Sequence, residues 1–206
     1  MNWSQIVAFC LLTSLLPVLP VLGEDGLVVA PSVTDSRYCL APAGVISLRL
    51  TVDFTYRNAG QTQIVLPRFS RLSGYALFRS EADLRADRPE ARSAVPMPDM
   101  FGSLKIEPSQ PSPVLFEAIP PGGSATRRDE VSIPLRTPGT DGQRLLGKSL
   151  LIQFTLDNWP GHRHIQESRG VWEPLGKLWA RQDTTGPVSV TIESNPTPMR
   201  CFPRVD

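Results

Sequence analysis

The sequence lacks the short motifs that mark the commonest catalytic and cofactor sites. It contains no Gly-x-Ser-x-Gly nucleophile elbow, no P-loop, no dinucleotide-binding fingerprint and no calcium-binding loop. We therefore expect no catalytic residue and no cofactor, and we interpret the protein as non-enzymatic. A small secreted hydrolase stays open as an alternative, because pairs of the 20 acidic residues can still meet in space.

An excess of charge of one sign is also absent. Lys and Arg total 21, and Asp and Glu total 20. A protein that binds nucleic acid or an anionic membrane surface normally carries a clear basic excess. We therefore expect no nucleic-acid partner. The arginines between Arg68 and Arg92 alternate with acidic residues, which indicates a mixed, solvated surface and not an anion funnel.

Charged side chains are missing from the first 23 residues. A run of apolar and small residues from Ile6 to Leu16 is followed by two helix-breaking prolines, and the small Gly23 lies where cleavage is expected. This arrangement predicts a signal peptide over residues 1–23, although a basic residue before the apolar run is lacking. Cleavage would leave a single domain, residues 24–206, that is secreted or periplasmic and has no stable membrane span. The alternative is an uncleaved membrane anchor, for which the apolar stretch is short.

Cysteine is scarce, since the chain has three and Cys10 lies in the predicted signal peptide. Cleavage would leave Cys39 and Cys201, which lie near opposite ends of the domain. In an oxidising compartment such an isolated pair usually forms a disulfide. We therefore predict a Cys39–Cys201 bond, with two buried free thiols or a link between two chains as the alternatives.

The clearest structural signal is strict alternation of apolar and polar residues over 45–57. A period of two predicts a strand with one face on the core and the other in water, as in antiparallel sheets. Asn58-Ala59-Gly60 suits a tight turn, and residues 63–66 resume an extended pattern. We therefore predict a β-hairpin that joins 45–57 to 63–66.

Further strand signals bring the total to about eight. The alternation recurs at 150–157 and 188–193, and weaker signals lie at 27–29, 75–78, 103–106, 114–119 and 131–135. Many short strands separated by Gly- and Pro-rich turns predict an all-β fold, a sandwich or a barrel of antiparallel strands.

Two segments depart from this strand pattern. Ser80-Glu81-Ala82-Asp83 is compatible with a capping box that opens one short helix before Pro89, or with a solvated loop. Eight prolines lie between Pro89 and Pro121. Because proline cannot donate to a β-ladder, we predict a Pro-rich loop region with edge strands around 89–121.

Three segments carry a resemblance to a known architecture. Residues 56–60, 119–124 and 189–196 are similar to strand-and-turn segments of exported bacterial immunoglobulin-like β-sandwich proteins of unknown function. The resemblance implies an immunoglobulin-like sandwich of about seven to nine strands. The chain departs from true immunoglobulin domains because it lacks their internal Cys-Trp-Cys spacing, so the predicted disulfide would tie terminal segments together. Such folds host many functions.

Two histidines are the weak candidates for a metal site. His162 and His164 occupy alternate positions, which point to one face of an extended segment. A structural zinc site needs four ligands, and no pattern marks the others. We therefore expect no metal ion and interpret both histidines as solvated.

The three tryptophans outside the predicted signal peptide lie within 21 residues, at Trp159, Trp172 and Trp179. Exposed tryptophans stack on sugars or anchor protein interfaces, whereas buried ones would pack over an open end of the sandwich. We predict a binding, assembly or cell-envelope accessory module with an unknown protein or glycan partner outside the cytoplasm. The first alternative is a carbohydrate-binding module that uses these three tryptophans.

Overall fold

The computed structural model describes residues 26–40, 44–68, 71–94, 116–136, 142–158 and 173–201. These residues are mostly β, as the alternation predicts, and form antiparallel sheets with one parallel strand pair. The segments around residues 1–23 and 103–106, for which a signal peptide and a strand are predicted, lie outside the described residues. Within the described part of the chain, no helix is long and apolar enough to cross a membrane.

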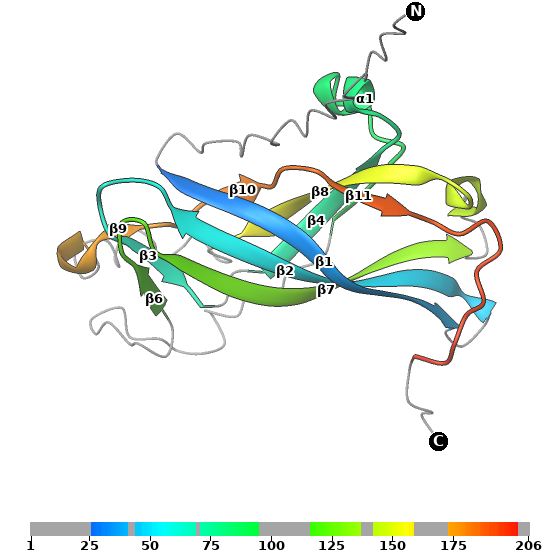
Figure 1. Ribbon diagram of the computed structural model, residues 1–206, viewed down its shortest axis with the longest axis horizontal. Coiled ribbons are helices and arrows are strands. Elements are labelled where there is room, and N and C mark those ends of the chain that lie inside the picture. Colours follow the sequence, from blue (N-terminus) through cyan, green and yellow to red (C-terminus); the bar gives the residue numbers. More distant parts are fainter. Residues whose placement is uncertain are drawn as a thin grey trace, which may run out of the picture.

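The first sheet contains the three longest strands and has the order β1-β2-β7 (Figure 1). Its members are β1 (Leu27–Leu40), β2 (Ile46–Asn58) and β7 (Ser124–Arg136). The alternation in β2 is confirmed, because Leu50, Val52 and Phe54 are buried whereas Thr51 and Asp53 between them are partly exposed. We call this sheet A.

The second sheet, sheet C, has the order β10-β8-β4-β5, and β11 also pairs with β8. Its members are β4 (Arg71–Phe78), β5 (Ala91–Ala94), β8 (Ser149–Asp157), β10 (Gln182–Thr184) and β11 (Val188–Thr191). The strands predicted at 150–157 and 188–193 are therefore confirmed as β8 and β11. Sheet C lies behind sheet A in the view of Figure 1.

The core lies between the buried faces of these two sheets. Phe54 of β2 meets Phe154 of β8 edge to face, with ring centroids 5.3 Å apart. Both residues belong to one cluster of buried apolar side chains, most of which come from β2, β4, β7 and β8. Burial of this cluster is the dominant stabilising contribution, since a fully buried large apolar side chain contributes about 1.5–3 kcal/mol.

A third, small sheet corrects the predicted hairpin. Strand β3 (Ile64–Pro67) pairs with β6 (Phe116–Ile119) and with β9 (Lys177–Leu178), and not with β2. Both edges of β2 are already occupied by β1 and β7. The hairpin prediction is wrong because β1, the strand just before β2 in the chain, and the distant β7 pair with β2 along its whole length, leaving no edge for β3.

Asn58 directs the chain out of sheet A at this point. Its buried side-chain amide donates to the carbonyl oxygens of Thr62 and Ile119, at 2.8 and 2.9 Å, and its Oδ1 accepts from the Gly60 amide at 3.0 Å. These bonds close the turn and join the end of β2 to the end of β6.

The predicted disulfide between Cys39 and Cys201 is confirmed, with its Sγ atoms 2.02 Å apart. The C-terminal segment also pairs with the end of β1, since the Met199 amide donates to the Tyr38 carbonyl and the Leu40 amide donates to the Met199 carbonyl, each at 2.8 Å. As expected from the chain's departure from the immunoglobulin cysteine pattern, the bond ties the C-terminal segment to the end of β1.

Of the two alternatives left open after Ser80, a short helix or a solvated loop, the structure has the helix. Helix α1 (Glu81–Arg85) begins at Ser80, whose hydroxyl accepts from the Asp83 amide at 3.2 Å. The predicted Pro-rich region contains β5 and β6 at its two ends, and residues 95–115 between them lie outside the described residues. Two short 3₁₀ turns, η2 (Gly142–Leu145) and η4 (Glu173–Leu175), complete the described elements.

Candidate functional site

Most of the residues singled out in the sequence lie outside the described residues: His162, His164, Trp159 and Trp172. Within the described ranges, no group of three or more His, Cys, Asp or Glu side chains is placed to hold a metal ion. Of the three candidate ligand contacts, the structure places Trp179 alone.

Trp179 is a core residue in the structure, with 2% of its surface exposed. Its indole N–H donates to the carboxylate of Asp183, and the guanidinium of Arg181 lies 3.9 Å from the ring centroid. Asn158 Nδ2 donates to the same carboxylate at 2.6 Å. Burial raises the pKa of Asp183, and these donors oppose that rise. The Trp179 ring therefore supports the fold and offers no open face to a sugar.

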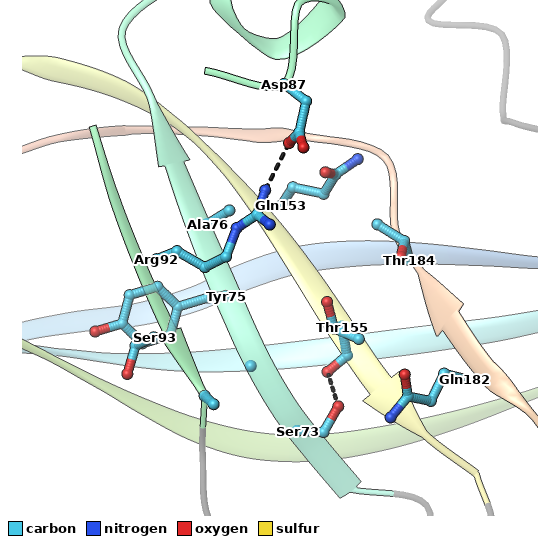
Figure 2. A pocket seen from close by; sticks show the side chains of 12 residues that line it. Ser73, Tyr75, Ala76, Asp87, Arg92, Ser93, Gln153, Thr155, Gln182 and Thr184 are labelled. Atoms are coloured by element: carbon cyan, nitrogen blue, oxygen red, sulfur yellow. Dashed lines mark hydrogen bonds and ion pairs between the residues drawn. The ribbon is translucent and has the colours of Figure 1, made fainter. Parts of the chain in front are cut away.

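The structure reveals a different concave surface, on the outer face of sheet C (Figure 2). The hollow arises because β4 contributes Gly74 and Ala76 to the middle of this face. Gly74 lies opposite Thr155 of β8 and Ala94 of β5, and Ala76 lies opposite Gln153 and Arg92 of the same two strands. The longer side chains of β5 and β8 thus rise above the middle of β4, where the side chains are absent or short. The hollow between them has a volume of about 410 Å³. We call this surface the outer groove.

Close packing of β4 against β5 depends on Gly74. A Cβ atom at this position would lie 2.8 Å from the carbonyl oxygen of Ser93, closer than real Cβ atoms approach backbone oxygen. The β4–β8 register also shifts between Leu72 and Gly74, where a bulge turns Ser73 toward the outer groove.

Uncharged hydrogen-bonding side chains line most of the outer groove. They are Ser73 of β4, Gln153 and Thr155 of β8, and Gln182 and Thr184 of β10. Ser73 donates its hydroxyl proton to the Thr155 carbonyl at 3.1 Å, and Gln153 donates to the Thr185 carbonyl at 3.1 Å. These bonds hold two of the lining side chains in fixed positions, as Figure 2 shows for Ser73.

One ion pair closes an end of the outer groove. Arg92 of β5 donates to the carboxylate of Asp87 at 2.5 Å. Asp87 has a φ of 47°, a left-handed conformation that Asp tolerates better than most residues. Because the two charges neutralise each other, the outer groove presents a nearly neutral, polar surface. Its chemistry is hydrogen bonding, and its hydroxyl groups adjoin no histidine or lysine among the lining residues.

Sequence reasoning missed the outer groove because its residues form no motif. The signals that were present are the polar positions of the alternating strand at 150–157 and the small residues at 74 and 76. Their meaning depends on which strands flank β4, and that pairing joins segments far apart in the chain.

Comparison with protein-family models, with curated proteins and with solved structures found no match for this chain.

Proposed function

We propose that this protein is an exported, non-enzymatic, immunoglobulin-like β-sandwich that binds a partner outside the cytoplasm. The outer groove is the observation that carries the binding role. Its polar side chains project from the strands of a rigid sheet, and β-scaffolds present ligand-contacting side chains in fixed positions in this way.

The packing of sheet A on sheet C supports the sandwich architecture. Two antiparallel sheets with Phe54 and Phe154 meeting between them match the layered core of a β-sandwich. The Cys39–Cys201 bond supports export, because disulfides form and persist in oxidising compartments such as the periplasm and the extracellular space.

A matched pair of variants tests the binding role. Thr184→Arg places a long cation in the outer groove, whereas Thr126→Arg places the same side chain at an exposed position of β7 in sheet A. Each variant and the wild type would be used, as immobilised disulfide-bonded chains, to capture partners from culture fluid and envelope extracts.

We expect a partner retained by the wild type and by Thr126→Arg to be lost with Thr184→Arg. Equal retention by all three proteins would refute the outer groove as the binding surface. Chemical conversion of the retained partner by the wild type would refute the non-enzymatic role.

Carbohydrate binding is the second candidate, and the uncharged amide and hydroxyl groups of the outer groove favour it. Such groups pair with sugar hydroxyls without the desolvation cost of a charge. Since Trp179 is buried, the ligand contacts of this candidate would come from Gln153, Gln182 and Thr184. A neutral-glycan array on which the Gln182→Ala variant loses the wild-type signal would support it, and an array without any wild-type signal would refute it.

A further inference from the structure

Strand β10 forms one wall of the outer groove and has little support from sheet C. It contains three residues, and among the described strands it pairs with β8 alone. Gln182 and Thr184 point into the outer groove (Figure 2), whereas Asp183 between them points to the opposite face of the strand. The Asp183 side chain is 12% exposed. A nearly buried carboxyl group therefore lies directly behind the groove wall.

The Asp183 carboxylate joins β10 to two other parts of the fold. It accepts hydrogen bonds from the Trp179 indole and from Asn158 Nδ2, and Arg181 Nε donates to it at 3.2 Å. Trp179 is fixed by the small third sheet, because its amide donates to the Val65 carbonyl at 2.9 Å. Asn158 directly follows β8 and is fully buried. The carboxylate thus ties a short edge strand to two well-packed neighbours.

The end of β10 has a support of its own. Thr185 directly follows the strand and is 2% exposed. Its amide donates to the Phe154 carbonyl at 2.9 Å, and its Oγ1 accepts from the Phe154 amide at 3.1 Å. These two bonds fix the neighbouring Thr184 independently of Asp183.

The beginning of β10 depends on Asp183. Here the Arg181 carbonyl accepts from the amide and from Nδ2 of Asn158, at 3.2 and 3.1 Å. The same Nδ2 donates to the Asp183 carboxylate at 2.6 Å, so the carboxylate holds the Asn158 side chain in the orientation that both of its bonds need. Gln182 lies between Arg181 and Asp183, and its position in the groove wall follows from these contacts.

The hydrogen-bonding partners described for the Asp183 carboxylate are all donors. An ionised carboxylate accepts from each of them, whereas a protonated carboxyl group carries an O–H donor of its own. Protonation would add a fourth donor hydrogen among three donors, so at least one of these hydrogen bonds must break. Because burial raises the pKa of Asp183 above its ordinary value of 3.8, protonation occurs at a less acidic pH than for an exposed aspartate.

Other ionisable groups lie on the elements around this carboxylate. They are Tyr56 of β2, Arg71 of β4, Arg127 of β7, Asp157 of β8 and Lys177 of β9. Among the described charged groups, Arg181 is the one that contacts the carboxylate itself. Asp157 is the other carboxyl group of this set, and it lies opposite Gln182 in the β8–β10 register. An experiment therefore has to separate its titration from that of Asp183.

We propose that Asp183 is a positioning residue for the outer groove: its ionised carboxylate holds Gln182 in the groove wall, and protonation releases the beginning of β10. The consequence is binding that weakens in acid, and this consequence rests on the function proposed for the outer groove. The state of β10 can be measured without a partner, so the two proposals can fail separately.

NMR and amide hydrogen exchange of the disulfide-bonded chain test the proposal from neutral pH to below 3.8. The Trp179 indole N–H resonance reports the ionisation of Asp183, to which it donates. Exchange protection of the Asn158 amide reports the beginning of β10, and protection of the Thr185 amide reports its end. We expect the Asn158 amide to lose protection with the midpoint of the Trp179 resonance, while the Thr185 amide stays protected. Constant Asn158 protection through this titration would overturn the proposal.

Three variants assign the transition to Asp183. Asp183→Asn, whose amide resembles the protonated carboxyl group, should show weak Asn158 protection at every pH. Asp157→Asn is the matched control and should keep the transition of the wild type. Arg181→Gln removes a charge that lowers the pKa of Asp183, so its midpoint should move to higher pH.

The variants also separate positioning from folding, since protection of the Thr185 amide shows that each one is folded. Arg181→Gln keeps Asp183 titratable, and it decides the question even where Asp183→Asn does not fold. Loss of the transition in folded Asp157→Asn, or an unchanged midpoint in Arg181→Gln, would overturn the proposal.

Capture at neutral pH from culture fluid and envelope extracts then connects β10 to binding. We expect Asp183→Asn to retain less than the wild type of a partner that Asp157→Asn retains fully. Equal retention by all three proteins, with Asn158 protection lost in Asp183→Asn, would refute the outer groove as the binding surface and leave the positioning role of Asp183 intact.

Discussion

Gly74 of β4 lies so close to Ser93 of β5 that the space between them has no room for a Cβ atom, which would be only 2.8 Å from the Ser93 carbonyl oxygen. Strand β5 pairs with β4, and both strands line the outer groove. The depth of the outer groove and the position of Arg92 therefore both depend on a residue without a side chain.

The first prediction follows from this contact. Gly74→Ala should push β5 away from β4 and destabilise the protein by about 1–3 kcal/mol, the usual cost of forcing extra atoms into a well-packed site. Gly186→Ala is the matched control, because nothing lies within 4 Å of a Cβ atom there. Urea unfolding would measure both. Equal stability of the two variants would contradict the close approach of Gly74 and Ser93.

The second prediction concerns the disulfide. Cys39 and Cys201 are 162 positions apart, so the bond removes a large loop-closure entropy from the unfolded chain. The double variant Cys39→Ser/Cys201→Ser should lose about 2–5 kcal/mol of stability. It should also be cut by protease near Met199, since the covalent tie that supplements the two backbone hydrogen bonds between Met199 and β1 is then lost. A reductant should reproduce the loss in the wild type and leave the double variant unchanged.

The third prediction concerns Asn58, whose side chain makes three hydrogen bonds at the point where the chain leaves sheet A. Asn58→Ala leaves the buried carbonyl of Ile119 without this donor, and we expect a loss of about 2–3 kcal/mol. Asn195→Ala, at an exposed position, should change stability by less than about 0.5 kcal/mol. Similar unfolding midpoints for the two variants would show that the turn does not depend on Asn58.

Local pattern was sufficient to predict β2 and β8, because each packs one face on the core and exposes the other. It was not sufficient for β1, which was expected only at 27–29 and extends to Leu40. Pro31 and a run of polar residues weaken the apparent alternation there, and the pairing with β2 shifts register between Val33 and Asp35. As an edge strand, β1 also has fewer buried positions to reveal it.

The outer groove illustrates a second limit of sequence reasoning. Arg92 was interpreted as part of a mixed, solvated surface, and it does pair with Asp87. Its place in the outer groove, across Ala76 from Gln153, arises because β4 pairs with both β5 and β8. Such a relationship comes from tertiary packing, to which no local periodicity corresponds.

The last prediction concerns pH and Glu90, whose side chain is 6% exposed and faces Arg79, Arg144 and Lys148. The hydrogen-bonded ion pair with Arg79 holds the pKa of Glu90 below its ordinary value of 4.5. A carboxyl group with a lowered pKa stabilises the fold fully above the unfolded-state pKa, and this contribution disappears as the pH falls through the folded-state pKa. Glu90→Gln should therefore be less stable than the wild type at neutral pH, and the difference should shrink steadily below pH 4.5.

Glu81→Gln, which breaks an exposed pair with Arg85, should cost less than about 0.5 kcal/mol at neutral pH. Urea unfolding across this pH range measures each difference. A gap between wild type and Glu90→Gln that stays constant into acid would mean that the ionised carboxylate contributes nothing to the fold, and that the three cations are held in place by other contacts.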